Sequence, residues 1–406
     1  MTTETGSAIE VRNATDDDWP HIVKLDSFNF GGHIADLKSG ITRELAPNDN
    51  VIVATNGGQV VGVTMHYDLQ ITVPGGALID LPGVTWVSVA PTHRRRGILR
   101  TLLTEQHQRF LDSGAPMSIL TASEGGIYGR FGYGPITTEF THKFDRRFAA
   151  FRSTTVDPGG VRLAAKDEAE EFLPPIYDRW RRQRAGAVGR PAAYWRGVFA
   201  DPESERGGAS ALFFLLHDDG FVSYRVRESA GSGMSLEIVD MFAVTPEAYI
   251  ALWRTLGGLD LMSTITVSES RDMLLPYLLK DPRLPRLTGS HDLLWARILD
   301  VPGVLRARSY ACELDVTIEV VDDFLDRGGV FRLTSRGNGG NAQCVPAEEP
   351  ARLTIGIGDL ASIYFGEHRA VTLAQAGRIS APEPEILERF DHAFTTSAAP
   401  RGGMFF

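Results

Sequence analysis

The stretch from Val87 to Leu103, VSVAPTHRRRGILRTLL, places three consecutive arginines and a glycine between two apolar segments. A strand that stops at Pro91 and turns into a helix leaves unpaired backbone N–H groups at the helix N-terminus. The helix dipole adds partial positive charge there, so an anion fits. Gly97 allows a phosphate to approach the backbone closely, and the neighbouring arginines can bind it. The pattern predicts a site for a small phosphorylated ligand.

Arginine clusters also occur as nucleic-acid contacts, targeting signals or solvated charge. The 406 residues carry a formal net charge of −10, whereas nucleic-acid binders usually show a broad basic face. An acidic protein repels phosphate backbones and attracts polycations. We therefore expect no nucleic-acid partner, and the strand–turn–helix setting favours a phosphate site over solvated charge.

The bulk composition is that of a soluble globular protein, with 43% hydrophobic and 23% charged residues, and the length predicts two or three domains. No apolar run approaches the roughly 20 residues that cross a bilayer. The polar N-terminus lacks a signal-peptide pattern, so we expect a cytoplasmic protein without a membrane span. Cys312 and Cys344 are expected to be free thiols. Histidines do not cluster around them, so no metal site is predicted.

Residues 9–146 read as strands alternating with helices. NVIVATNGGQVVGVTMHYDLQITV predicts a hairpin around its NGG turn. RGILRTLLTEQHQRFLDSG predicts an amphipathic helix that ends at Gly114, and PMSILTAS predicts a further strand. TTEFTHKFD alternates like an exposed edge strand. The predicted class is α/β or α+β, with helices packed on a mixed sheet.

A turn-rich segment at about residues 152–160 predicts a seam, and a second boundary falls near residues 300–308. The domains are therefore expected at 1–152, 153–300 and 301–406. Within the second, Val244-Thr245-Pro246 precedes a predicted helix, as Val89-Ala90-Pro91 does in the first, but no arginine turn follows. This pattern indicates a weak internal repeat without the phosphate site. Two terminal phenylalanines predict a packed tail, because exposing both costs a few kcal/mol.

At this point the sequence resembles a known family. VSVAPTHRRRGILRTLL resembles motif A of the GNAT N-acetyltransferases, a strand, R-x-x-G-x-G/A and a helix. Arg94 and Gly97 match it, whereas Leu99 stands where a small residue is usual. Together with LTASEGGIYGRFGYGP (Leu120 to Pro135), the stretch resembles the mycobacterial Eis, or enhanced-intracellular-survival, acetyltransferase family. The resemblance covers the whole chain. It implies an active GNAT domain, a degenerate GNAT-like domain and a sterol-carrier-protein-like α/β domain.

This resemblance implies acetyl-CoA as co-substrate and no metal. The backbone of three strand residues would pair with the pantetheine amides as an added strand does. These strand residues are Val87, Ser88 and Val89. The residues that would surround the pyrophosphate are Arg94, Arg95, Arg96, Gly97, Ile98, Leu99 and Arg100. Ser123 and Glu124, at the end of the next strand, would also contact the cofactor.

By the same resemblance, Tyr128 matches the general acid and the C-terminal carboxylate of Phe406 matches the general base. Amine acetylation needs a base because amines are mostly protonated at pH 7. An α-carboxyl has an ordinary pKa of about 3.3–3.7, which is too low unless burial raises it. Tyr128, with an ordinary pKa of about 10, can protonate the leaving thiolate. His93 and His107 are alternative bases, but their positions favour surface or core roles.

Members of the family acetylate aminoglycosides, often at several amines, and some lysine side chains. Asp292 matches an acidic residue of the acceptor pocket, and Asp26 and Trp86 are further candidates for it. The penultimate residue can be an acid in the family, whereas it is Phe405 here. We therefore expect a less acidic pocket base, with altered regioselectivity or fewer acetylated sites. The family commonly forms hexamers, so a homohexamer is implied.

Two other functions remain open on the sequence alone. One is acetylation of protein lysines, which needs the same acid and base as antibiotic modification. The other is a lipid-binding scaffold with an inactive transferase, which the intact arginine–glycine turn argues against. No cysteine lies near the motifs, so direct attack in a ternary complex is expected rather than a covalent intermediate.

Overall fold

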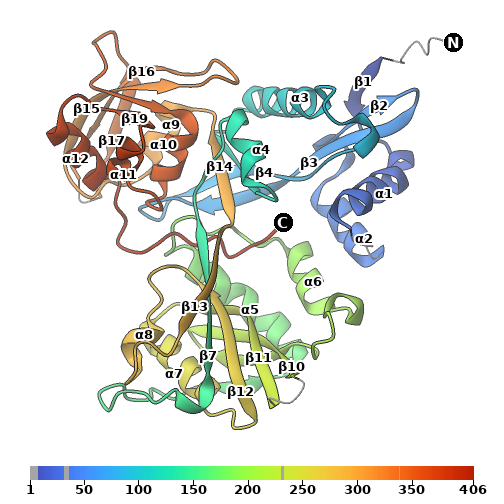
Figure 1. Ribbon diagram of the computed structural model, residues 1–406, viewed down its shortest axis with the longest axis vertical. Coiled ribbons are helices and arrows are strands. Elements are labelled where there is room, and N and C mark those ends of the chain that lie inside the picture. The colour runs from blue at the N-terminus through green and yellow to red at the C-terminus, as the bar shows by residue number, and fades with distance from the viewer. Residues whose placement is uncertain (1–7, 32–35, 230–232, 338) are drawn as a thin grey trace.

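The computed structural model describes residues 8–31, 36–229, 233–337 and 339–406. Within them the strands form two seven-stranded sheets and one five-stranded sheet. Figure 1 shows the first and third sheets side by side in the upper half of the molecule and the second sheet below them. The C-terminus lies at the centre, between the upper and lower halves. The predicted mixed α/β class is confirmed.

The first sheet has the strand order β1-β2-β3-β4-β5-β14-β6. Its strands are β1 (Ile9–Asn13), β2 (Val51–Asn56), β3 (Gln59–Thr72), β4 (Leu78–Val89), β5 (Met117–Thr121), β6 (Gly134–Pro135) and β14 (Leu294–Ile298). The helices that accompany it are α1 (Trp19–Phe30), α2 (Asp36–Leu45), α3 (Ile98–Asp112) and α4 (Gly125–Tyr128). The predicted hairpin is present: Gly57 and Gly58, both with positive φ, turn β2 into β3.

Two irregularities open the first sheet beside α3. Between the pairs Val63–Ser88 and Met65–Thr85, β4 contains one residue more than β3, which is a β-bulge. Trp86, within the bulge, has a φ of 51°. On its other side, β4 pairs with the parallel strand β5 only through Gly83 and Val84. Beyond this short pairing the two strands diverge and leave a cleft.

The second sheet has the order β13-β7-β12-β11-β10-β9-β8. Its strands are β7 (Thr138–Asp145), β8 (Arg162–Ala164), β9 (Phe213–His217), β10 (Gly220–Ser229), β11 (Gly233–Ala243), β12 (Met262–Glu269) and β13 (Arg286–Asp292). Its helices are α5 (Lys166–Arg181), α6 (Ala192–Ala200), α7 (Pro246–Gly257) and α8 (Leu275–Leu278). Short 3-10 turns include η3 (Pro91–His93) and η6 (Glu203–Glu205).

The first two sheets exchange one strand each. β7 follows the strands of the first sheet in sequence but joins the second sheet, and β14 leaves the second unit to pair with β5 and β6. The prediction that TTEFTHKFD is an edge strand is therefore wrong. As β7 it lies between β12 and β13, because the edge position belongs to the distant segment 286–292. The expected domain boundaries at 152 and 300 stay predictions, since the sheets interleave across the sequence.

The third sheet has the order β17-β16-β15-β18-β19. Its strands are β15 (Leu314–Val321), β16 (Gly329–Ser335), β17 (Ala342–Pro346), β18 (Leu353–Gly356) and β19 (Ile379–Ser380), and its helices are α9 (Val301–Ala307), α10 (Ile357–Tyr364), α11 (Ala370–Gln375) and α12 (Pro384–Ala393). A fully buried ion pair between Arg297 of β14 and Asp322, which follows β15, connects this sheet to the first. Burial alone would raise the pKa of Asp322, but the charge and hydrogen bond of Arg297 hold it below its ordinary value.

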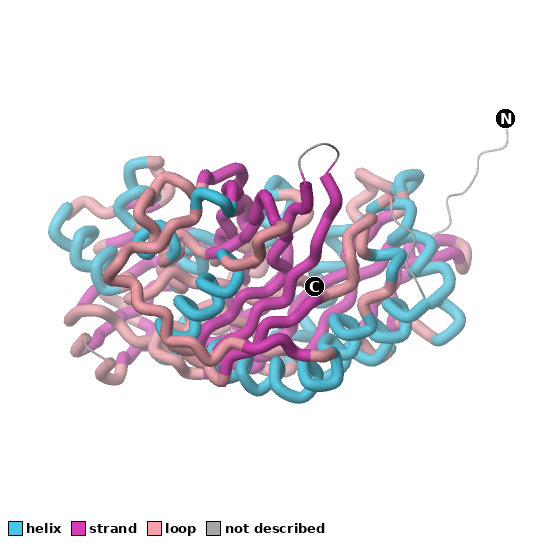
Figure 2. The backbone as a smooth tube through the Cα atoms, turned by 90° about the horizontal axis from the view of Figure 1, so that it is seen from below, coloured by secondary structure: helices cyan, strands magenta, loops and turns pink. Residues whose placement is uncertain are grey.

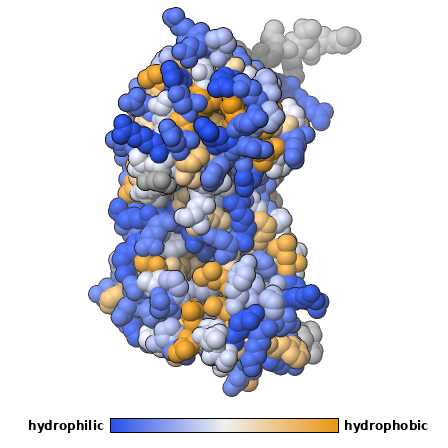
Figure 3. Space-filling view, turned by 90° about the vertical axis from the view of Figure 1, so that its left-hand side faces the viewer, coloured by the Kyte–Doolittle hydropathy of each residue, from blue (hydrophilic) through white to orange (hydrophobic). Residues whose placement is uncertain are grey.

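The last residues run back from the third sheet to the middle of the molecule. Viewed from below, strands cross the centre, helices lie toward the outside, and the C-terminus projects over the central strands (Figure 2). Figure 3 shows a mostly hydrophilic face, on which apolar side chains form separate small groups above and below a narrower waist. The predicted packed tail is present at Ala399, Gly402, Gly403 and Met404, which are buried, and Phe406 is partly buried. The expectation that both terminal phenylalanines pack is wrong for Phe405, which is 68% exposed.

Candidate active site

The arginine run forms the turn between β4 and α3. After η3 the chain reaches Gly97, the N-cap of α3, whose φ of 82° is in the left-handed region that glycine adopts without strain. No side chain caps this helix, so its first N–H groups remain available to an anion. An added Cβ at Gly97 would meet no atom within 4 Å, so a phosphate can reach the backbone here.

A cavity of about 450 Å³ lies over this turn and extends to the ends of β4 and β5. Every residue that the sequence assigned to cofactor binding lines it except Arg96, namely Val87, Ser88, Val89, Arg94, Arg95, Gly97, Ile98, Leu99, Arg100, Ser123 and Glu124. Arg94 donates to Asn29 Oδ1 at 2.6 Å, and the guanidinium of Arg100 lies 5.5 Å from the ring centroid of Phe324. These two arginines are therefore oriented by protein groups.

A second cavity, of about 640 Å³, adjoins the first at four shared lining residues: Phe30, Val87, Ser123 and Tyr128. Asp26 and Trp86 line it, as predicted for an acceptor pocket, and Phe405 and Phe406 line it from the C-terminal tail. Asp292 lines neither cavity. It is exposed at the end of β13 and accepts a hydrogen bond from the indole nitrogen of Trp295.

Tyr128 lies where the two cavities meet, at the end of α4. Its side chain is only 5% exposed and packs against Tyr133, with the ring centroids 6.2 Å apart. Burial raises the pKa of the Tyr128 hydroxyl, a hydrogen bond with Ser123 lowers it in part, and the negative charge of Glu124 raises it further. The phenol is therefore protonated at neutral pH and can donate a proton.

Phe406 brings the chain terminus to the point where β4 and β5 separate. Its carbonyl oxygen accepts a hydrogen bond from Thr121 Oγ1 at 2.6 Å, at the end of β5. Its ring lies against the backbone of Gly83, where an added Cβ would be 2.9 Å from a carbon of the Phe406 ring. The ring centroids of Phe406 and Tyr67 are 6.2 Å apart. The terminal carboxyl group therefore lies at the inner end of the cleft.

The sequence missed one whole wall of the second cavity. This wall comes from α6, η6 and the strands of the second sheet, and its residues are Tyr194, Gly197, Val198, Asp201, Pro202, Glu205, Leu212, Arg225 and Val239. None belongs to a motif, and only docking of the second unit on the first brings them to the site. Acidic residues in the PESE segment are the one signal that could have pointed to the wall, but such segments are common on surfaces.

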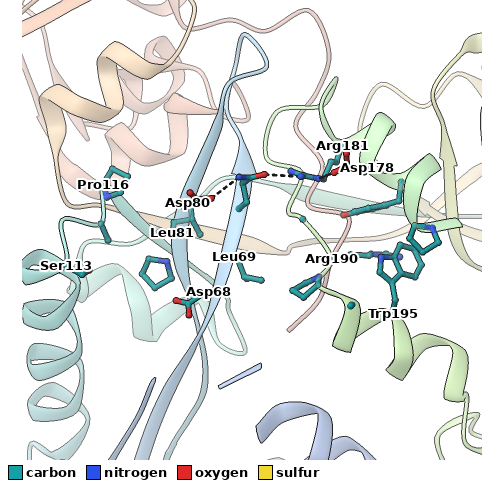
Figure 4. A pocket seen from close by; sticks show the side chains of 18 of the residues that line it. Asp68, Leu69, Asp80, Leu81, Ser113, Pro116, Asp178, Arg181, Arg190 and Trp195 are labelled. Carbon is teal, nitrogen blue, oxygen red and sulfur yellow. Dashed lines mark hydrogen bonds and ion pairs between the residues drawn. The ribbon is translucent and has the colours of Figure 1, made fainter. Parts of the chain in front are cut away.

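A larger cavity, of about 780 Å³, lies between β3, β4 and α5, away from these residues. Polar groups of this cavity are already paired: Arg181 contacts Asp178 (Figure 4). The side chain of Gln70 accepts a hydrogen bond from Arg181 and donates one to Asp80. It contains no predicted site residue. Size alone therefore does not identify the site in this molecule.

Neither alternative histidine lines the second cavity, although His93 lines the first. His107 is buried in the middle of α3, where Nδ1 donates to the carbonyl of Leu103 at 2.6 Å and Nε2 accepts from the hydroxyl of Tyr133 at 3.1 Å. Burial lowers its pKa to about 4. His93 lies in the turn and contacts Asn56 and Thr92. Both are held by structural contacts.

In the part of the chain that the structure describes, no cluster of three or more His, Cys, Asp or Glu side chains is arranged to hold a metal ion. Cys312 and Cys344 are free thiols. Among the described helices, none has the combination of length and apolar character needed to span a bilayer.

Comparison with known proteins gives the same organisation. Residues 10–136 and 186–298 each match the Acetyltransferase (GNAT) domain family, and residues 301–401 match the Sterol carrier protein domain family. The fold and the cleft over the arginine turn thus define an acetyltransferase of the GNAT class, whose members use acetyl-CoA as acetyl donor.

Full-length relatives define the family more narrowly. The chain is 41% identical over 396 residues to the N-acetyltransferase Eis of Mycobacterium tuberculosis strain H37Ra, covering 94% of this chain and 96% of that protein. It is 33% identical to an uncharacterized N-acetyltransferase of Streptomyces avermitilis, over 96% and 98% of the two chains. The structure of Eis1 from Mycobacterium abscessus superposes with a TM-score of 0.86 at 30% identity, over 98% and 100% of the chains. The chain belongs to the Eis family of N-acetyltransferases.

His107 allows a test of its structural role. The pKa of His107 is about 4 in the folded protein and 6.5 in the unfolded chain. Between these two pH values His107 is therefore protonated in the unfolded chain and neutral in the folded protein. Acidification from pH 6.5 toward 4 therefore lowers the unfolding free energy, by up to about 1.4 kcal/mol per pH unit. His107→Gln should narrow the gap between urea midpoints at pH 7 and pH 5, whereas His21→Gln, at an exposed position, should not. An unchanged gap in His107→Gln would contradict the assignment.

Proposed function

We propose that the enzyme transfers an acetyl group from acetyl-CoA to amines of an aminoglycoside, by direct attack in a ternary complex. The observation that carries this proposal is the junction of the two cavities at Tyr128, together with Phe406 in the lining of the second cavity. One cavity has the anion-binding turn that a CoA pyrophosphate needs, and the other is open to an acceptor. The two reactants then meet at Tyr128, so no acetyl-enzyme is required.

The cofactor is expected to enter the cleft between β4 and β5. Its pantetheine amides would hydrogen-bond the backbone from Val87 to Val89, where β4 no longer pairs with β5. Its pyrophosphate would rest on the N-terminal amides of α3 and on Arg95 and Arg100. This arrangement brings the thioester to the inner end of the cleft, near Tyr128.

Proton transfers then follow from the positions of two groups. The Phe406 carboxylate removes a proton from the acceptor ammonium, and the freed nitrogen lone pair attacks the acetyl carbonyl carbon. The carbon–sulfur bond breaks, and the Tyr128 hydroxyl donates its proton to the departing sulfur. The acetylated nitrogen then releases its remaining excess proton, which restores the Tyr128 phenol and leaves a neutral amide. The raised pKa of Tyr128 keeps the phenol protonated until that step.

The acceptor cavity carries charge suited to a polycation. Asp26 lies on the wall from the first domain and the exposed Glu205 on the opposite wall from the second. Asp201 is already paired with Arg225 at 2.5 Å and with Arg206 at 3.3 Å. A ligand with several separated ammonium groups can contact both walls at once, whereas a single lysine side chain presents one ammonium.

Tyr128→Phe should lower kcat about 100-fold, because the departing thiolate loses its proton donor. The dissociation constant for acetyl-CoA should stay within about twofold, since the phenyl ring keeps its packing. Tyr133→Phe is the matched control, because that hydroxyl bonds Ser118 and lines neither cavity. Steady-state kinetics and calorimetry measure both quantities. A kcat within threefold of the wild type in Tyr128→Phe would refute the general-acid role.

The acceptor class is tested by free-thiol release from acetyl-CoA with a panel of aminoglycosides and lysine peptides. We expect aminoglycosides to give kcat/KM values at least about tenfold higher, because several ammonium groups contact opposite acidic walls. Neutral sugars of similar size serve as the control for thiol release without an acceptor amine. Equal or higher values with lysine peptides would favour protein acetylation instead.

Phe405 tests the number of amines acetylated. Its side chain is 68% exposed and lines the acceptor cavity, so it gives an apolar surface beside the terminal carboxylate. Phe405→Glu should increase the number of acetyl groups per kanamycin-like acceptor, because the added carboxylate can hold further ammonium groups near the base. Mass spectrometry of the products measures this. Full multi-acetylation by the wild type that Phe405→Glu leaves unchanged would contradict the expectation.

A further inference from the structure

The second GNAT domain contains a strand–helix–strand unit of the same order as the cofactor-binding unit of the first. β11, α7 and β12 follow one another as β4, α3 and β5 do. The parallel strands β11 and β12 pair from Met234 to Glu237 and then separate, as β4 and β5 separate after Val84. The second domain therefore retains a cleft between diverging strands.

The C-terminal tail lies in this second cleft. Arg401 donates from one guanidinium nitrogen to the carbonyl of Met241 on β11 at 3.1 Å, and from the other to the carbonyl of Ser268 on β12 at 3.3 Å. One side chain thus joins the two separated strands. Its guanidinium also lies 4.9 Å from the ring centroid of Phe242. The tail therefore bridges the two strands beyond the point where their pairing ends.

The helix of the second unit is also closed to a phosphate. Thr245 is the N-cap of α7, and its hydroxyl accepts a hydrogen bond from the N–H of Ala248 at 3.2 Å. The first unit has Gly97 at the same place and no side-chain cap. The cap satisfies one of the amides that an anion would use, and no arginine turn precedes this helix.

Arg190 fixes the tail next to this cleft. Two of its nitrogens bind the carboxylate oxygens of Asp240 on β11, each at 2.8 Å, and two of them donate to the carbonyl of Gly403 at 2.9 and 2.5 Å. Its side chain is 3% exposed and lies among aromatic rings that include Tyr177 and Trp195. Figure 4 shows Arg190 beside Trp195. A forked, fully charged guanidinium can make these contacts together, and an ammonium cannot.

Gly403 sets the direction of the last residues. Its φ is 71°, and an added Cβ would lie 2.7 Å from the hydroxyl oxygen of Tyr177 and 2.9 Å from a ring carbon of Trp180. The preceding Gly402 accepts a hydrogen bond from the N–H of Val188 at 2.9 Å. Both glycines are therefore clamped against the second domain, three to four residues before the terminal carboxylate.

We propose that the second domain uses its cofactor-like cleft to hold the chain's own C-terminal tail, and that Arg190 is the positioning residue for the Phe406 carboxylate. The inference rests on the proposed function, in which that carboxylate is the general base. The degenerate domain then contributes to catalysis without binding acetyl-CoA. A displacement of the base by about 1 Å lowers turnover up to about 100-fold, so the anchor governs kcat.

The test is a double-mutant cycle in the full-length enzyme, combining Arg190→Lys with one glycine added after Phe406. The lysine keeps the charge opposite Asp240, and the added glycine moves the carboxylate without removing tail contacts. Arg190→Lys alone should lower kcat about 10- to 100-fold with the KM for acetyl-CoA within twofold. In the extended chain it should have no further effect, because the carboxylate is already displaced. Arg182→Lys, at an exposed arginine that contacts Asp178, is the matched control.

A second readout does not depend on activity. Carboxypeptidase should release Phe406 faster from Arg190→Lys than from the wild type or Arg182→Lys, because the tail is less firmly held. Arg401→Lys removes the bridge between β11 and β12 while the Arg190 contacts remain, and it should also speed release. These two variants measure the anchoring independently of each other.

The outcomes separate the inference from the proposed function. If Arg190→Lys lowers kcat by the same factor in both chains, or leaves kcat and tail release at wild-type values, the positioning role is wrong. If the extended chain alone keeps wild-type kcat, the terminal base is wrong, and carboxypeptidase release still decides whether Arg190 anchors the tail.

Discussion

Two parallel strands that stop pairing leave backbone N–H and C=O groups that need other partners, and this requirement governs the molecule. In the first domain β4 and β5 separate after Val84 and Leu120, beside a bulge that holds Trp86 in the left-handed region. The open edge of β4 then lies in line with the uncapped N-terminus of α3. The unpaired edge of β4 and the anion site at the start of α3 thus follow one another. This arrangement suits a long ligand with an amide-bearing arm and a phosphate group.

The second domain meets the same requirement in another way. Its strands β11 and β12 also separate, but the guanidinium of Arg401 binds one carbonyl from each. A Thr cap at residue 245 takes the place of an open helix N-terminus. The two domains thus share diverging strands and differ in the partners of the unpaired backbone groups. In the first domain these groups stay open to solvent and ligand, and in the second domain side chains of the protein itself hydrogen-bond them.

Strand exchange makes the two domains one structural unit. Because β7 is an interior strand of the second sheet and β14 lies between β5 and β6 of the first, neither sheet is complete without the other half of the chain. The buried Arg297–Asp322 pair adds the third sheet to this unit. The catalytic role that we propose for the terminal carboxylate requires such a connected scaffold, because movement between loosely linked domains would displace that group.

The chemistry of the arginine turn could be predicted from the sequence because it is local: Arg94 to Arg100, Gly97 and the flanking periodicity lie within one strand–turn–helix segment. The family resemblance added Tyr128 and Phe406, and both line the second cavity. The sequence did not predict the wall of the second cavity with Tyr194 and Glu205, the place of β7 inside a sheet, or the position of Asp292 outside both cavities. It also gave no sign that Arg190 would bind Gly403.

These features arise from segments that lie far apart in the chain, where hydrogen bonding and packing, rather than neighbouring residue types, decide which groups meet. The amino-acid sequence by itself therefore determined the arginine–glycine turn and the domain types. Only the tertiary structure decided which strands complete each sheet, what fills the second cleft and where the chain terminus lies, because each of these depends on long-range contacts between surfaces.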